Sequence, residues 1–124
     1  MTLSINVKQN RGKQAEQLAL TYLQQQGLSL VTRNFHSRRG EIDLIMMDKE
    51  TLVFIEVRYR KSSKYGSALE SVNHTKQSRI IHTAKIFLQQ HSGNHLECRF
   101  DVVAISPNNN TSEVIWVKDA FQLN

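Results

Sequence analysis

The sequence predicts an α/β fold in which helices flank a mixed central β-sheet, formed by a single domain over residues 1–124. Two observations carry this prediction: two segments have the apolar period of an amphipathic helix, and several short segments between and after them alternate as strands do. With 124 residues, 40% of them hydrophobic, the chain suffices for one core and is short for two domains. No repeat or low-complexity linker marks a second domain.

The first helix is predicted over residues 11–26, where apolar residues recur at helical spacing. The residues of this predicted apolar face are Ala15, Leu18, Ala19, Tyr22 and Leu23. Gly27 follows directly and is the residue type that commonly ends a helix. Residues 28–35, rich in Leu and Val, are predicted to form a strand.

Two central strands are predicted over residues 41–47 and 51–59, because apolar side chains alternate along both. The polar residues 48–50 between them indicate a tight turn, so the two strands are expected to form an antiparallel hairpin. The expected register pairs Met47 with Leu52, and a slip of one residue would turn every side chain to the other face.

The second helix is predicted over residues 73–90. Its apolar stripe consists of Ile80, Ile81, Ala84, Phe87 and Leu88. Two more strands are expected at residues 96–105 and 113–118, joined by a turn at residues 107–110. Residues 60–66 are polar and basic and are predicted to form a loop.

Composition narrows the class of protein. No apolar run approaches the roughly 18 residues of a membrane span, and the polar start lacks the apolar segment of a secretory signal, so a cytoplasmic location is expected. Cys98 is the single cysteine, which excludes an intramolecular disulfide and a cysteine-based zinc site. The net charge of +5 favours polyanions such as nucleic acid, although solubility or a membrane surface would explain it equally well.

The predicted hairpin carries acidic side chains at its centre. Its register places Asp43 opposite Glu56 and Glu41 opposite Arg58. Strand alternation is expected to place Glu41, Asp43 and Ile45 on one face of the first strand. Two carboxylates facing each other across a strand pair lie roughly 5 Å apart at Cβ and destabilise the pair. With apolar neighbours on both strands, such carboxylates either share a proton or bind a cation. Mg²⁺ accepts carboxylate oxygens and keeps waters that a phosphate can replace.

Simpler interpretations of the same residues stand beside this one. Charged residues near strand ends are usually solvated, and Glu56 has Arg58, Arg60 and Arg39 as candidate ion-pair partners.

The segments Gly40-Glu41-Ile42-Asp43-Leu44-Ile45 and Val53-Phe54-Ile55-Glu56-Val57-Arg58 resemble the core strands of the PD-(D/E)xK nuclease superfamily. The whole chain resembles the YraN-type family of small bacterial proteins, which is similar to archaeal Holliday junction resolvases. Further residues that carry this resemblance are Gly12, Ala15, Glu16, Arg33, Asn34, Phe35, Lys76, Arg79, Ile80 and the segment Arg99-Phe100-Asp101-Val102-Val103. The resemblance implies a restriction-endonuclease-like, resolvase-like core.

The resemblance also implies roles for individual residues. Asp43 and Glu56 would be metal ligands for Mg²⁺ or Mn²⁺, with the Val57 carbonyl as a third ligand. Glu16 matches an acidic residue that completes such sites in resolvase-like relatives, and a solvated helix glutamate explains it as well.

Two residues depart from the superfamily motif. Ile42 replaces a proline that has no chemical role. Arg58 replaces the motif lysine, and an arginine stays protonated, so it can grip a phosphate but cannot act as a base. Lys61 and Lys76 are candidates to take over the lysine's part.

Basic residues bracket the acidic pair in the sequence and are expected at the same end of the hairpin, where they suit a phosphate backbone. The predicted nucleic-acid-binding residues are Arg33, Arg38, Arg39, Arg60, Lys61 and Lys76. A solvated basic loop is the simpler alternative for this run. Phe35 and Tyr59 are aromatic candidates for stacking on splayed bases, although the pattern favours a core position for Phe35.

These observations lead to three hypotheses. The first is a metal-dependent endonuclease for DNA, including branched or structured DNA, with Asp43, Glu56, Arg58 and Glu16 in the catalytic site. The second is a nucleic-acid-binding module that keeps the fold without turnover, because of Arg58. The third is a scaffold whose acidic pair binds a structural cation. A resolvase-like enzyme would also act as a two-fold homodimer, since two strands must be cut.

Overall fold

The computed structural model describes residues 7–61, 69–91, 97–108 and 111–122. The elements in chain order are α1 (Val7–Gln25), β1 (Ser29–His36), β2 (Glu41–Asp48), β3 (Thr51–Tyr59), the short 3₁₀ helix η1 (Leu69–Ser71), α2 (His74–Gln90), β4 (Glu97–Asn108) and β5 (Thr111–Phe121). β4 extends three residues beyond its predicted end at residue 105, and β5 is longer than predicted at both ends. Most of the predicted 60–66 loop and half of the 107–110 turn lie outside the described residues.

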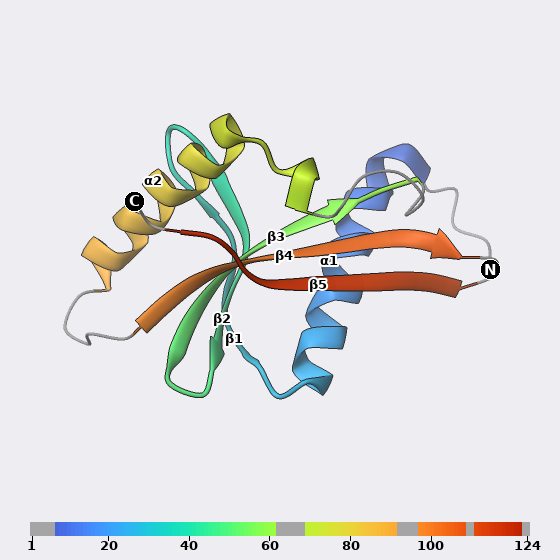
Figure 1. Ribbon diagram of the computed structural model, residues 1–124, viewed down its shortest axis with the longest axis horizontal. Coiled ribbons are helices and arrows are strands. Elements are labelled where there is room, and N and C mark those ends of the chain that lie inside the picture. Colours follow the sequence, from blue (N-terminus) through green and yellow to red (C-terminus); the bar gives the residue numbers. More distant parts are fainter. Residues whose placement is uncertain (1–6, 62–68, 92–96, 109–110, 123–124) are drawn as a thin grey trace.

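The five strands form one twisted sheet in the order β1-β2-β3-β4-β5 (Figure 1). β3 and β4 run parallel, and the other three neighbouring pairs are antiparallel. The parallel pair is joined through α2, because a parallel connection must cross over one face of the sheet. The sheet is therefore mixed, as predicted.

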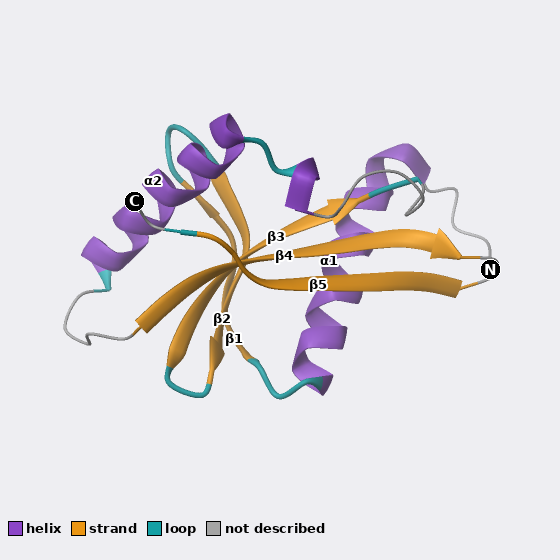
Figure 2. Ribbon diagram, in the orientation of Figure 1, coloured by secondary structure: helices purple, strands orange, loops and turns teal. Residues whose placement is uncertain are grey.

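The two helices cover opposite faces of the sheet (Figure 2). α2 packs on one face through Ile80, Ala84 and Phe87, against a buried cluster that includes Phe54 and Phe100. α1 covers the other face in a second buried cluster, whose members include Leu23, Leu44, Met46, Val53, Ile55, Val103 and Ile105. The predicted α/β arrangement with flanking helices is confirmed.

The apolar face of α1 differs from the prediction at one position. Ala15, Ala19 and Leu23 are buried, whereas Leu18 is 43% exposed. Leu20 is buried in its place, because α1 turns a neighbouring stripe toward the sheet. Gly27 ends the helix with a φ of +99°, a conformation that favours glycine.

The central hairpin has the predicted register. Met47 pairs with Leu52, and the ladder continues to Leu44 opposite Ile55, which makes Asp43 and Glu56 the next facing positions. The turn is tighter than a four-residue loop, since residues 48 and 51 also pair.

The prediction that Glu41, Asp43 and Ile45 share one face is wrong. Ile42 and Ile45 both belong to the cluster against α2, while Leu44 belongs to the cluster against α1. Strict alternation would separate Ile42 from Ile45, so the side-chain phase of β2 changes between Ile42 and Leu44. The change occurs at Asp43, where the ladder to β3 has ended.

Candidate metal and phosphate site

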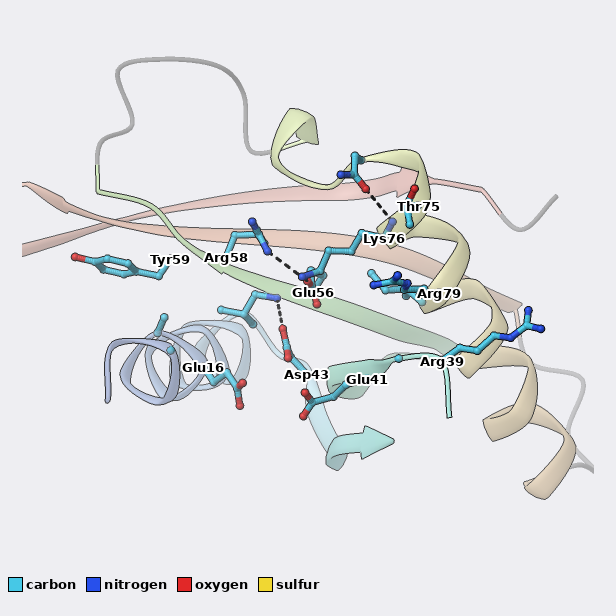
Figure 3. Close-up of a pocket in the computed structure, with 16 residues that line it drawn as sticks. Glu16, Arg39, Glu41, Asp43, Glu56, Arg58, Tyr59, Thr75, Lys76 and Arg79 are labelled. Carbon is cyan, nitrogen blue, oxygen red and sulfur yellow. Dashed lines mark hydrogen bonds and ion pairs between the residues drawn. The ribbon is translucent and has the colours of Figure 1, made fainter. Parts of the chain in front are cut away.

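A pocket of about 420 Å³ lies where the start of β2 and the end of β3 meet the helices (Figure 3). α1 contributes Glu16 on one side, and the first turns of α2 contribute Lys76 and Arg79 on the other. The charged residues that line it are Glu16, Arg39, Glu41, Asp43, Glu56, Arg58, Lys76 and Arg79. The pocket therefore combines four carboxylates with four cationic side chains.

Asp43 has an unfavourable position for a carboxylate. Its Oδ2 accepts one hydrogen bond from the Val57 backbone N–H, at 2.8 Å. Burial, the charge of Glu56 and a hydrogen bond between the two carboxyl groups together raise the pKa of Asp43 to about 9, although the hydrogen bond from Val57 acts in the opposite direction. Glu16 adds a smaller effect of the same sign. At neutral pH this carboxyl group holds a proton unless a cation replaces it.

Glu56 faces the α2 side of the sheet and is 4% exposed. Its Oε2 lies 2.9 Å from Nζ of Lys76 and 3.9 Å from Nη1 of Arg58. The N-cap Asn73 holds the first turn of α2 in place, because its side chain accepts a hydrogen bond from the Lys76 backbone N–H at 2.9 Å. The Asn73 cap thus fixes the first turn of α2, and the ammonium group of Lys76 on this turn reaches the acidic pair.

A second pair of carboxylates lies on the α1 side and is bridged by Asn34. The Asn34 Nδ2 donates to Oε1 of Glu16 at 3.0 Å and to Oε1 of Glu41 at 3.1 Å. Asn34 has a φ of +51°, in the left-handed region that asparagine tolerates better than most residues. Glu41 also lies 3.5 Å from His36 Nε2, so its partners are on β1 and the predicted pairing of Glu41 with Arg58 is not formed.

The turn between β1 and β2 is docked on α2. The Ser37 and Thr83 hydroxyls are 2.7 Å apart, and Thr83 donates to the Arg79 carbonyl. A Cβ at Gly40 would stand 3.2–3.3 Å from atoms of Arg79 and Thr83, so the close approach depends on glycine. This contact brings the turn, with Arg39, to the edge of the pocket.

The predicted basic residues divide into two groups. Arg39, Arg58 and Lys76 line the pocket, which confirms that the turn before β2 and the end of β3 lie at the same end of the hairpin. The remaining predicted residues, Arg33, Arg38, Arg60 and Lys61, do not line it. Arg33 donates to Oε1 of Gln17 on α1 at 3.3 Å.

The carboxylates do not form a three-residue metal cage. Among the residues that the structure describes, no three His, Cys, Asp or Glu side chains are grouped closely enough to hold a metal ion. Asp43 and Glu56 are the carboxylates in mutual contact, and Glu16 is held by Asn34 instead. A ligand role for Glu16 stays a prediction.

Comparison with known proteins places the chain in a family. The profile of "Uncharacterised protein family UPF0102" matches residues 15–105. The chain belongs to the UPF0102 family. It is 50% identical over 115 residues to a UPF0102 protein of Nitrosococcus oceani, covering 92% of this chain and 93% of that protein. A UPF0102 protein of Alcanivorax borkumensis is also 50% identical, over 116 residues, with 92% and 93% covered.

Membership of UPF0102 agrees with the YraN-type resemblance. The matched span includes both strands of the acidic pair and the first half of α2, so the pocket lies almost entirely within the region that defines the family. None of the helices in the described part of the chain has the length and apolarity needed to cross a membrane.

One feature of this UPF0102 site, the Asn34 bridge, was not predicted from the sequence. The Asn34 bridge depends on a left-handed backbone conformation, for which an asparagine between charged segments is only a weak signal. Phe35 is partly buried and packs against the core, its ring edge-on to Phe87 with the centroids 5.2 Å apart, which confirms the core position that the sequence favours over base stacking.

Proposed function

We propose that the chain is a metal-dependent endonuclease that acts on DNA and hydrolyses a phosphodiester bond beside Asp43 and Glu56. The observation that carries the proposal is the contact between the partly buried carboxyl group of Asp43 and the buried one of Glu56, in a pocket with a cationic rim. A divalent cation removes their repulsion, and the rim attracts a polyanion. The UPF0102 membership itself names no activity.

The donor set fits Mg²⁺ or Mn²⁺. Magnesium in phosphate-processing sites is commonly held by one or two carboxylates, with waters and phosphate oxygens filling the other positions. Asp43 and Glu56 would supply the carboxylates, and the Val57 carbonyl is a candidate for a further position. A bound cation of this kind polarises a phosphoryl oxygen and lowers the pKa of an attacking water.

The cationic side of the pocket would hold the phosphate. The Nε of Arg58 is buried without a hydrogen-bond partner, so the guanidinium lacks one acceptor that a phosphate oxygen could supply after a small rotation. Thr75 and Asn73 line the pocket at the N-terminus of α2, an end of a helix that favours anions.

Lys76 is the best candidate for the part that the superfamily motif assigns to a lysine at position 58. Its Nζ lies 2.9 Å from Glu56, so a compact ammonium donor reaches the acidic pair from α2 rather than from β3. Together, Lys76 would orient the attacking water and Arg58 would stabilise the charge that develops on the phosphorane.

A nucleic-acid-binding module without turnover is the second candidate, and Arg58 is the observation that favours it. Position 58 holds an arginine in place of the motif lysine. If Lys76 only neutralises Glu56, no lysine orients the attacking water, and the site would bind DNA without cutting it. This alternative predicts that DNA binding weakens steeply with salt, because phosphate contacts release counterions.

The test is a cleavage assay on four-way junction, single-stranded and duplex DNA with Mg²⁺ or Mn²⁺. We expect cleavage by the wild type and its loss in Asp43→Ala and Lys76→Ala, with Arg33→Ala as the matched control for loss of one positive charge outside the pocket. Arg58→Lys should cleave at least as fast as the wild type. If the wild type and Arg58→Lys both bind DNA in a salt-sensitive way and neither cuts it, the second candidate function is established. If the wild type neither binds nor cuts DNA, both candidate functions are refuted.

A further inference from the structure

We propose that a single unpaired base of the substrate strand binds in a second hollow beside the acidic pocket, stacked on Tyr59. This inference rests on the proposed function, since the base belongs to the strand whose phosphate would lie at Asp43 and Glu56. It restricts the substrate to nucleic acid with an unpaired nucleotide near the cut, as at a junction, a flap or a single strand.

The hollow has a volume of about 260 Å³, below the roughly 300–1,000 Å³ of pockets that enclose a drug-sized ligand, which suits one planar group. Its lining consists of Gln14, Ala15, Leu18, Tyr59, Ile105, Pro107 and Ser112. Ala15 and Tyr59 line the acidic pocket as well, so the two cavities adjoin each other at these residues.

The lining combines an aromatic ring, apolar walls and a polar rim. Tyr59 is 37% exposed and Leu18 is 43% exposed, so both present apolar surface to solvent at this point. Leu18 is the residue whose sequence pattern predicts burial, and it faces this hollow instead. Gln14 and Ser112 are exposed at the rim and offer hydrogen-bonding groups to a base edge. Stacking on an aromatic ring tolerates any base.

The position of Tyr59 suits a strand that leaves the acidic pocket. Tyr59 lies three residues beyond Glu56 on β3, about 10 Å along the strand. That length corresponds to about three stacked nucleotides, or fewer in an extended strand. Figure 3 shows the ring beyond Arg58, away from Arg39. A phosphate at the acidic pair and a base on Tyr59 would thus belong to nearby nucleotides.

The experiment measures binding of single-stranded oligonucleotides that carry one abasic residue at successive positions, with Ca²⁺ replacing Mg²⁺ so that cleavage is prevented. The proteins are the wild type, Tyr59→Phe, Tyr59→Thr and the control Val31→Thr. Val31 is 45% exposed on β1 and lines neither cavity, so it matches Tyr59 as an exposed apolar strand residue.

We expect Tyr59→Thr to weaken single-strand binding about tenfold or more, while Tyr59→Phe and Val31→Thr bind as the wild type does. An abasic residue at one position should cause the same loss in the wild type and no further loss in Tyr59→Thr. Fully paired duplex should bind less tightly than single strand and should not distinguish the variants.

The base site and the proposed nuclease function fail differently. If the wild type cuts DNA but Tyr59→Thr and the abasic strands behave normally, the base site is refuted and the nuclease function stands. If no DNA is bound or cut, both are refuted. If Tyr59→Thr dissociates a dimer in sedimentation and leaves the affinity for single strand unchanged, the hollow receives a second copy of the chain, which also refutes the base site.

Discussion

Asp101, which is buried, and Asp43, which is partly buried, are both carboxylates of this sheet, and they differ in how many donors surround them. Asp101 on β4 is 0% exposed and accepts hydrogen bonds from Arg99 Nε, Arg99 Nη2, Trp116 Nε1 and the Asp119 backbone N–H, at 2.9–3.2 Å. Asp43 on β2 accepts one backbone hydrogen bond and faces Glu56.

The difference separates a structural carboxylate from a candidate ligand. The donors around Asp101 satisfy its lone pairs, and a buried charge compensated in this way ties β4 to β5. Asp43 lacks such compensation, and its surroundings favour the protonated form. Carboxylates that are surrounded by too few hydrogen-bond donors or positive charges to stabilise the ionised form are candidates for binding a cation or for catalysis.

The largest effect on stability is expected at the compensated site. Asp101→Ala should lower the free energy of unfolding by about 3–5 kcal/mol, because it removes the buried carboxylate that the Arg99 guanidinium and the Trp116 N–H both donate to. Chemical denaturation of the wild type and the variant measures this loss in the free energy of unfolding. Asp48→Ala is the control: it removes the other carboxylate of Arg99, which is partly exposed, and should cost about 1 kcal/mol or less. Equal losses in the two variants would contradict the comparison.

Asp43→Asn should have the opposite effect to Asp101→Ala: it should lower activity and raise stability. Under the proposed function it lowers the single-turnover cleavage rate by about a hundredfold or more, since the cation loses a charged ligand. The same substitution should raise the melting temperature at pH 7 and above, because a partly buried acid with a raised pKa no longer has to ionise or hold a proton. A variant that keeps its activity, or that melts at a lower temperature, would contradict this account of Asp43.

The pH dependence of stability follows from the same pKa. In the unfolded chain Asp43 loses its proton near pH 4, and in the folded protein near pH 9. Between these values the folded state holds the extra proton, so this group makes the free energy of unfolding fall as pH rises, by at most about 1.4 kcal/mol per pH unit. Urea denaturation of the wild type and Asp43→Asn across pH 5–9 measures the difference, which should widen with pH. A constant difference would show that Asp43 has an ordinary pKa.

The smallest expected effect concerns the turn that brings Arg39 to the pocket. Gly40→Ala should destabilise the protein by about 1–3 kcal/mol, since its Cβ would press on Arg79 and Thr83. Gly12→Ala is the matched control, because no atom lies within 4 Å of its Cβ and alanine favours a helix. The melting temperature should therefore fall in Gly40→Ala and rise in Gly12→Ala. An unchanged melting temperature in Gly40→Ala would show that the turn between β1 and β2 moves to accommodate the added methyl group.

The parts of the molecule that depend on local pattern could be predicted from the sequence. The alternation of the two central strands and their polar turn predict the hairpin and its register, and the register alone sets Asp43 opposite Glu56. Local pattern could not predict the phase change of β2 at Asp43, because it arises where the ladder to β3 ends and β1 distorts at Asn34.

The parts that depend on packing between distant elements could not be predicted. Lys76 meets Glu56 because α2 crosses the sheet at one particular angle, which no spacing in the sequence specifies. Leu18 satisfies the helical period of α1, yet the helix turns its neighbour Leu20 to the sheet instead. The acidic pair was therefore predictable and Lys76 was one of two candidate lysines, whereas which lysine reaches Glu56 and where the apolar hollow lies were not predictable.

The most direct test of the central claim is Mn²⁺ binding, measured by the electron paramagnetic resonance signal of the free ion. The account predicts that the wild type and Asp101→Asn, studied below its melting temperature, bind Mn²⁺, whereas Asp43→Asn and Glu56→Gln do not, and that binding at pH 7 releases a proton from Asp43. Mn²⁺ binding that survives Asp43→Asn, or a wild type that binds none, would contradict it.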